Sequence, residues 1–393
     1  MSSEVTVSQA FIKFFTSLKL TVVLLVLSML LVFIATIAQV QLGIHGVLDR
    51  YFRTFFVMAF VGENRIPLPW FPGGYLIGGF LLINLIASHL YRFKITWKKA
   101  GIQLTHFGLI VLLVGELVTG ILQEEFALTF NEGETKSYSE AFRDNEVVII
   151  DTTDADEDVV TAIPESVIAD GDPIQHGALP FRVLIHGYYA NADLTMRNSL
   201  PADSTPPGMA PNIANQGIGP RIAVFPKRYS YDDNDRNLPV AILELVGTEG
   251  SIGTWLVSPM LPMPQTFEYA GRSFRIGMRF TREYKPFAMK LIELKHDVYP
   301  GSQIPKNFSS RVHVTALDGS EDREALIYMN HPLRYQGYTF YQFQMDSANG
   351  MSRLQVVRNP GYMMPYIATI LMTLGLLLQF GIHLVKFTQR RTA

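Results

Sequence analysis

The chain has 393 residues, of which 48% are hydrophobic and only 17% are charged, and its mean hydropathy is +0.17. Average soluble proteins carry about 25% charged residues, so this composition favours a protein with a membrane portion. The formal net charge of −2 gives no basic excess and argues against a nucleic-acid partner. Cysteine is absent, which excludes disulfides, thiolate metal sites and thioether attachment of a cofactor to this chain.

Four apolar segments are suited to cross a lipid bilayer as helices. A helix needs about 20 apolar residues to span roughly 30 Å of hydrocarbon. The segments that meet or approach this length are 20–40, 75–91, 102–122 and 362–387. The first is longer than the apolar core of a cleaved signal peptide, which has about 7 to 15 residues, so we expect it to stay as a span.

Basic residues flank these segments unevenly, and lysine and arginine accumulate on the cytoplasmic side of membrane helices. If the four spans alternate in direction, all basic clusters fall on one side, which predicts that both termini are cytoplasmic in a multi-pass protein of the inner (plasma) membrane. Residues 41–74 and 123–361 then face the periplasm. The clusters comprise Lys13, Lys19, Arg92, Lys94, Lys98, Lys99, Lys386, Arg390 and Arg391.

Within the first outward loop, the stretch from Val47 to Phe60 has aromatic residues at helical spacing. Such a pattern is typical of a helix that lies in the membrane interface or packs within the loop. We expect a short helix here, and both placements fit the pattern.

The segment 124–361 consists of short runs rich in Val, Ile, Phe, Tyr and Thr that are separated by Gly, Asn, Asp and Pro. These are strand and turn signals. Because most runs have no helical pattern between them, an antiparallel sandwich or open barrel is favoured over a parallel α/β sheet. Residues 190–220 lack periodicity and predict a long insert that is mobile unless a partner orders it.

The predicted fold class is therefore membrane α plus β, with four transmembrane helices and a large antiparallel β-rich extracytoplasmic domain between the third and fourth. The expected domains are a membrane domain over 1–123, the β-rich domain over 124–361, and a last span with its tail over 362–393. The β-rich part shows no motif of a metalloprotease, a serine hydrolase or a phosphate-binding loop. Its histidines lack metal-ligand spacing, which favours structural roles for His176, His186, His296, His313 and His331.

Ionisable side chains within membrane spans are costly and are therefore functional candidates. His89 and His106 lie at the inner ends of spans two and three, within about 5 to 10 Å of the basic flank at 1.5 Å rise per residue. His383, three residues before Lys386, reaches the same leaflet. Imidazoles at one depth are suited to bind a haem iron, or they merely snorkel or hydrogen-bond to neighbouring helices. Glu116 lies about 15 Å further out than His106 and has no assigned role.

Several stretches are similar to those of a known family. SLKLTVVLLVLSMLL opens the first span, THFGLIVLLVGEL lies in the third, and KHDVYPGSQIPKNFSSRVHV is followed by YMNHPLRYQGYTFYQFQ before the fourth. The phrase from Met329 to Gln342 is the most specific of these. In these residues, and in its order of spans and exported domain, the chain resembles the ResB family of system II cytochrome c biogenesis over nearly its whole length.

This resemblance implies a membrane subunit that acts with a ResC-type partner to deliver haem for attachment to apocytochromes c. A histidine near the inner end of the third span is implicated in haem handling in that family, and His106 occupies the matching place. The resemblance thus implies a non-covalent haem b, with His106 bound to the haem iron and His89 and His383 as further candidates from their depth. Both a resident haem and a haem in transit fit this interpretation.

The Trp-rich haem-binding signature of the partner is absent, because Trp70, Trp97 and Trp255 are widely separated. Attachment chemistry is therefore expected on another polypeptide, and this chain is not expected to be an enzyme by itself. Two alternatives are a membrane scaffold without haem, whose β domain docks another protein, and a small-solute transporter. The second is disfavoured because the sequence shows no inverted repeat or pair of broken helices.

Overall fold

A computed structural model describes residues 7–61, 66–91, 96–201, 206–230, 236–261, 263–301, 305–346 and 349–392. By its internal contacts the chain forms two units. A helical unit comprises the residues up to Glu124 and those from Arg358 onward, and a β unit comprises most of the chain between them. Arg92 and Lys94, which the sequence places in a basic flank, lie outside the described residues.

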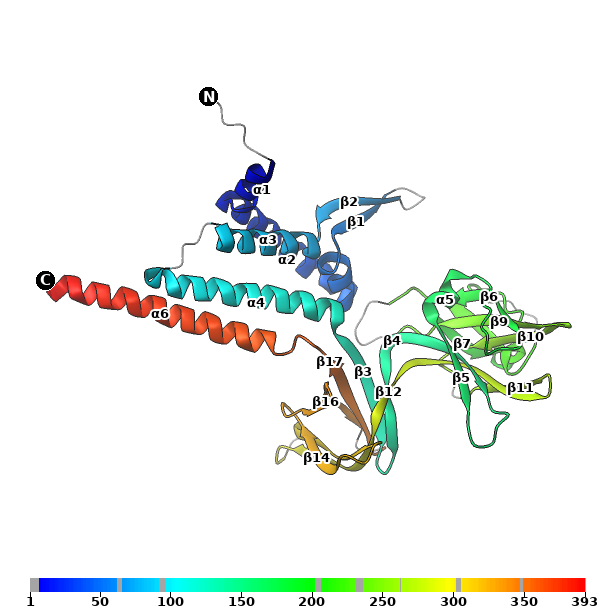
Figure 1. Cartoon of the computed structure of the whole chain (residues 1–393). Coiled ribbons are helices and arrows are strands. Elements are labelled where there is room, and N and C mark those ends of the chain that lie inside the picture. The colour runs from blue at the N-terminus through cyan, green and yellow to red at the C-terminus, as the bar shows by residue number, and fades with distance from the viewer. Residues whose placement is uncertain are drawn as a thin grey trace. The chain divides into compact units, whose positions relative to one another are not determined.

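The helical unit contains the four predicted spans (Figure 1). Its helices are α1 (Val7–Phe15), α2 (Leu18–Val47), α3 (Gly74–Tyr91), α4 (Ala100–Leu122) and α6 (Met364–Thr392). The stretches long and apolar enough to cross a membrane are Leu18–Phe52, Gly74–Tyr91, Trp97–Leu122 and Met364–Arg391, which confirms the prediction of four membrane helices, three of them N-terminal and one C-terminal.

The chain around the first span departs from the expected simple helix. Gly43 adopts φ 64°, a backbone conformation that only glycine enters without cost, and it kinks α2 near its end. The predicted helix over residues 47–60 is wrong beyond its first turns. A π-helix covers Leu48–Phe52, but β1 (Phe56–Val61) then pairs with β2 (Ile66–Pro72) as an antiparallel hairpin.

Helices α4 and α6 pack closely and run antiparallel (Figure 1). Gly101, Gly108 and Gly115 are buried and recur every seventh residue, so they form one stripe along α4. A Cβ added at Gly101 would lie 2.6 Å from the Gly375 carbonyl oxygen, and one at Gly115 would lie 2.6 Å from the Cβ of Met364. Small residues allow this approach between backbones, as is common between membrane helices.

The β unit is dominated by one antiparallel sheet of ten strands in the order β14-β13-β12-β4-β3-β17-β16-β15, with β11 paired to β12 and β5 paired to β4. Because β14 also contacts β16, the sheet nearly closes into a barrel, as the open-barrel prediction required. Its strands are β3 (Glu124–Asn131), β4 (Thr135–Asp151), β5 (Val159–Pro164), β11 (Gln265–Tyr269), β12 (Arg272–Val298), β13 (Pro305–Ala316), β14 (Asp322–Tyr328), β15 (Leu333–Tyr335), β16 (Tyr338–Asp346) and β17 (Met351–Arg358).

The long strands β4 and β12 extend into a second layer of the β unit. There they face the three-stranded sheet of β6 (Arg182–Tyr189), β9 (Val240–Gly247) and β10 (Gly250–Val257) and the short helix α5 (Glu165–Asp170). Trp255 and Phe274 are fully buried in the core that these elements share. The N-terminal half of β12 thus belongs to this core, and its C-terminal half belongs to the near-barrel.

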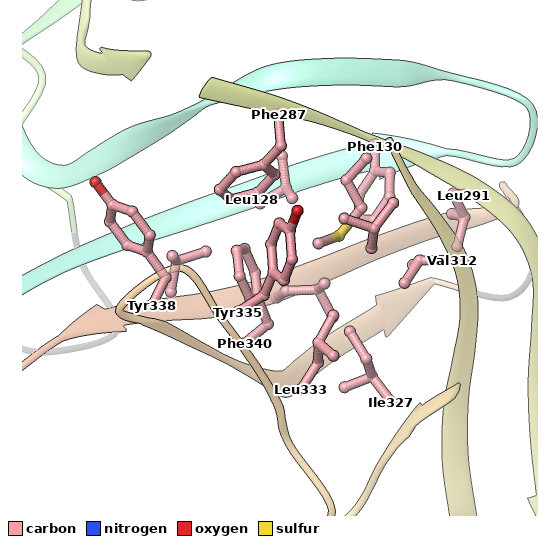
Figure 2. Packing of buried hydrophobic residues seen from close by; sticks show 14 residues of the cluster. Leu128, Phe130, Phe287, Leu291, Val312, Ile327, Leu333, Tyr335, Tyr338 and Phe340 are labelled. Atoms are coloured by element: carbon pink, nitrogen blue, oxygen red, sulfur yellow. The ribbon is translucent and has the colours of Figure 1, made fainter. Parts of the chain in front are cut away.

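The core of the near-barrel explains the most specific phrase of the sequence, Met329 to Gln342. Leu333, Tyr335, Tyr338 and Phe340 of this phrase are buried together against Phe287 (Figure 2). Between β15 and β16 the two turn residues, Gln336 and Gly337, both have positive φ, as a tight type I′ hairpin requires. The phrase is therefore a packing motif that closes the barrel.

Where the insert over 190–220 is described, it contains one strand, short 3-10 turns and otherwise irregular backbone that makes defined contacts. Strand β7 (Ala192–Met196) pairs with β8 (Ile222–Pro226), and Ala210 and Ala214 are buried in a small core with Val224. The amide of Asn212 donates to the carbonyl oxygens of Gly219 and Ile222, each at 2.9 Å. This segment is thus held by small buried side chains and by side-chain hydrogen bonds to the backbone, which produce no periodic pattern in the sequence.

The glycine stripe gives a testable prediction. A Cβ at Gly108 would lie 2.9 Å from the Ala368 carbonyl oxygen, so Gly108→Leu must push α4 and α6 apart. Such overpacking costs about 1 to 3 kcal/mol, and a lower Tm of the detergent-solubilised chain is the expected result. Gly78→Leu is the control, because a Cβ at Gly78 meets nothing within 4 Å. Equal melting of both variants would contradict the packing role.

Candidate functional site

The structure brings two of the predicted membrane histidines together. His89 lies in the last turn of α3 and His106 in the second turn of α4, and their ring centroids are 6.1 Å apart with planes at 40°. Both side chains are partly exposed rather than enclosed in the helical unit. His89 also interacts with the backbone of Gln103 on α4. The antiparallel pairing of α3 and α4 thus creates the equal depth that the sequence predicted.

The hydrogen bond of His106 fixes which ring nitrogen can bind a metal. Its Nδ1 lies 2.7 Å from the carbonyl oxygen of Ile102, one turn earlier in α4. A carbonyl oxygen only accepts, so Nδ1–H donates and the lone pair of the neutral ring lies on Nε2. A backbone carbonyl that holds one imidazole nitrogen in this way is a common support for a metal-binding histidine.

The donor set fits the iron of a flat macrocycle. The rings of His89 and His106, with centroids 6.1 Å apart, would hold such a group through their imidazole nitrogens. Neutral imidazole is a usual ligand of haem iron. The helices α3 and α4 that carry the two rings are apolar over most of their length. These two residues are therefore suited to hold such a group.

His383 lies on α6, and its Nε2 is 2.9 Å from Nε2 of Gln379, one turn earlier. Among the described residues it makes no ring contact with His89 or His106. Glu116 is exposed on α4, in the turn next to Gly115. The structure thus joins only two of the three histidines, and it leaves Glu116 at the surface of the helical unit.

The basic residues gather at the same end of the helical unit as the histidines. Lys98 and Lys99 are exposed in a 3-10 turn just before α4. Because the backbone of Gly101 meets that of Gln379, this end of α4 adjoins the part of α6 that leads to Lys386. The local charge therefore favours an anionic group next to the two imidazoles.

Asn84 is a polar residue within a span that the sequence analysis missed. It is 3% exposed on α3, and its amide nitrogen donates to the carbonyl oxygens of Phe15 at 2.6 Å and Ser17 at 3.3 Å. Its amide oxygen accepts from the hydroxyl of Thr21 at 2.7 Å. Asn84 therefore provides hydrogen-bond donors for backbone carbonyl oxygens at the break between α1 and α2. The sequence signal that could have identified this residue is a single asparagine within the largely apolar stretch 75–91.

Outside the membrane spans, the histidines of the β unit serve local packing. His186 pairs with Glu244, and hydrogen bonds from Ser251 and then His186 lower the pKa of the Glu244 carboxyl. His313 pairs with Asp322, while His296 and His331 stack on Phe308 and Tyr328, respectively. No group of three or more metal-binding side chains occurs in the described parts of the chain. The site of interest therefore remains the pair in the helical unit.

The fold and this pair define a multi-pass membrane protein in which four apolar helices flank a large antiparallel near-barrel, with two imidazoles close together on neighbouring helices. The profile of the ResB-like family matches residues 87–351, which are more than half of the sequence. The chain belongs to the ResB-like family.

Curated relatives agree with this assignment. Protein NrfI of Wolinella succinogenes is 26% identical over 314 residues, which are 76% of this chain and 29% of that protein. The cytochrome c biogenesis protein CcsB of Picosynechococcus is 30% identical over 125 residues, 32% of this chain and 26% of CcsB. CcsB of Synechococcus elongatus is 30% identical over 105 residues, 27% and 23% of the two chains. The chain spans less than a third of the length of each relative.

The role of Asn84 is testable. Hydrogen bonds between membrane helices contribute about 0.6 kcal/mol on average and up to about 1.7, so Asn84→Leu should destabilise the helical unit by about 1 to 2 kcal/mol. Faster proteolysis near the junction of α1 and α2, together with a lower Tm, is expected. Thr36→Val is the control, because the Thr36 hydroxyl donates within α2 to Val32. If both variants behave like the parent, the interhelical role is wrong.

Proposed function

We propose that this chain is the haem-handling membrane subunit of a system II cytochrome c assembly complex. Membership of the ResB-like family and relatives named for cytochrome c biogenesis support the pathway. The observation that supports haem binding is the His89–His106 pair on α3 and α4, whose ring centroids lie 6.1 Å apart. The ligand is a non-covalent haem b, because the chain has no cysteine to form a thioether.

In this proposal the residues of the chain bind and orient the haem. His106 presents Nε2 to the iron, since Ile102 holds its Nδ1–H, and His89 supplies the second imidazole from α3. Lys98 and Lys99 pair with the propionates near the membrane surface. Because the haem iron supplies the redox chemistry, the protein needs to provide only ligation, orientation and an apolar surround.

The proposed location is the inner (plasma) membrane, with both termini cytoplasmic and the β domain in the periplasm. The shared end of the basic flanks supports this orientation, because lysine and arginine favour the cytoplasmic side. The antiparallel contact of α4 with α6 also supports it, since the chain must then leave and return on one side of the membrane.

A ResC-type partner and an apocytochrome c complete the proposed complex. The matched relatives are more than three times as long as the regions that they share with this chain, so further parts act beside this region in those proteins. We assign bond formation between haem and apocytochrome to such a partner, because the three tryptophans of this sequence are widely separated and do not form the Trp-rich signature of the partner. The β domain is the surface that meets partners outside the membrane.

The test is the haem content of the purified chain, alone and together with its partner. His106→Ala removes the best-placed ligand, and a several-fold loss of the haem absorbance per protein is expected. His383→Ala is the matched control, since this histidine lies in the same leaflet but contacts Gln379. Unchanged haem content in His106→Ala, with impaired assembly of the complex, would instead favour a scaffold without haem.

The orientation is tested separately with reporter fusions. A phosphatase that is active only in the periplasm should be active when fused after Gln123 and inactive when fused at the C-terminus. The reason is that α4 and α6 cross the membrane in opposite directions. An active C-terminal fusion would overturn the proposed topology while leaving the haem assignment to its own test.

A further inference from the structure

The outer face of the near-barrel carries arginines interleaved with aromatic rings. Side chains alternate between the two faces of a strand, so Phe142 on β4, Phe343 on β16 and Arg353 on β17 point away from the core around Phe340. Arg236, from the segment before β9, lies over the same face. We call this set the Arg–Phe cluster; its members are Phe142, Arg236, Phe280, Arg282, Phe343 and Arg353.

Phe142 lies at the centre of the cluster. The Arg353 guanidinium is 5.1 Å from the Phe142 ring and 5.9 Å from that of Phe343. The Arg236 guanidinium is 5.9 Å from the Phe142 ring and 4.5 Å from that of Phe280. These are cation–π distances, and the cationic groups and rings alternate to form a continuous surface.

Within the described part of the β unit, the contacts of the cluster carry more positive than negative charge. Arg282 pairs with Glu140 at 3.2 Å, and the same carboxylate is the acidic neighbour of Arg353. Glu125, a second carboxylate near β17, accepts a hydrogen bond from Gln355 at 3.2 Å. Among the residues that the structure describes, the three guanidinium groups therefore have one directly paired carboxylate, Glu140.

Arg353 is the arginine of the Arg–Phe cluster whose hydrogen-bonding groups are least satisfied. Its Nε is buried and has no hydrogen-bond partner among the residues that the structure describes. Burial lowers the pKa of its guanidinium, because the charged form loses hydration that stacking on rings replaces only in part. A guanidinium stacked by its face still presents N–H groups at its edge, in the fork that suits a carboxylate.

The surface beside the cluster is apolar and accessible. Phe343 is 54% exposed, and Tyr284, whose ring lies 5.7 Å from that of Tyr138, is 59% exposed. Arg282 lies over the Tyr138 ring at 4.1 Å, which joins these tyrosines to the cluster. A ligand that matches this surface needs a flat apolar body for the rings and carboxylates for the arginines.

We propose that the Arg–Phe cluster binds a planar ligand of the porphyrin dicarboxylate class, with its carboxylates on Arg353 and Arg236 and its ring on the exposed phenylalanine. The biological identity of the ligand as haem rests on the proposed function. The site itself lies in the β unit and does not depend on His89 or His106.

The test uses the full chain in detergent and iron-free protoporphyrin IX as the probe, followed by its fluorescence. Without iron the probe cannot be held by axial imidazoles. We expect the diacid to bind about tenfold more tightly than its dimethyl ester. Arg353→Gln and Arg236→Gln should each weaken binding of the diacid by about tenfold and leave that of the ester unchanged, as loss of one charge-assisted contact predicts.

Two controls separate binding from folding. Arg323→Gln removes an exposed arginine of the same β unit that lies near the ring of Tyr335, and it should not change the affinity. Arg353→Lys keeps the charge but loses the fork, so it should bind with intermediate affinity and melt like the parent. Equal binding of diacid and ester, or unchanged affinity in both glutamine variants, would overturn the proposal.

His106→Ala distinguishes this proposal from the proposed function. It should lower the haem content of the chain without changing the affinity for protoporphyrin. Displacement of the diacid by an acidic peptide, with the ester bound equally well, would assign the face to protein docking and reject a porphyrin site. Loss of diacid binding in His106→Ala would place the porphyrin in the membrane helices and also reject the cluster.

Discussion

The close antiparallel contact of α4 and α6 is the constraint on which the helical unit depends. Within a bilayer, helices gain little from burying apolar surface, so their packing rests on backbone approach and on hydrogen bonds. The stripe of Gly101, Gly108 and Gly115 permits that approach. At the far end, the Asn359 side-chain amide donates to Thr119 and Gln123, which ties the chain entering α6 to the end of α4. The exit and re-entry of the β segment are thereby fixed side by side.

The polar groups of the spans divide into two kinds. Asn84 is buried and fully engaged, and it stabilises the break between α1 and α2. His89 and His106 are partly exposed, their ring centroids lie 6.1 Å apart, and the Ile102 carbonyl oxygen holds Nδ1 of His106. The first arrangement is what a structural role requires, because every donor and acceptor finds a partner within the protein. The second is what a ligand-binding role requires, which is why the proposed function rests on that pair.

The β unit combines a closed core with a charged outer face. Core residues such as Phe287 and Phe340 pack inside the near-barrel, and the Arg–Phe cluster lies outside that core. Partial burial of a guanidinium group removes favourable hydration free energy, and stacking on Phe142 compensates for only part of that loss. The Arg–Phe cluster is therefore the feature of the β unit on which the proposed porphyrin site rests.

Hydropathy and charge were enough to determine the four spans and the β-rich middle of the chain. The reason is that a helix in lipid needs a long apolar run and a strand needs a short alternating one, and both are local sequence patterns. Equal depth of His89 and His106 followed from their distances to the basic flanks. Only the tertiary structure decided that these two, without His383, come together, since helix rotation is set by packing. It also decided the β1–β2 hairpin, the burial of Ala210 and Ala214 within the insert, and the Arg–Phe cluster. Phe142 and Arg353 are far apart in sequence, and their meeting depends on strand order, which no local pattern encodes.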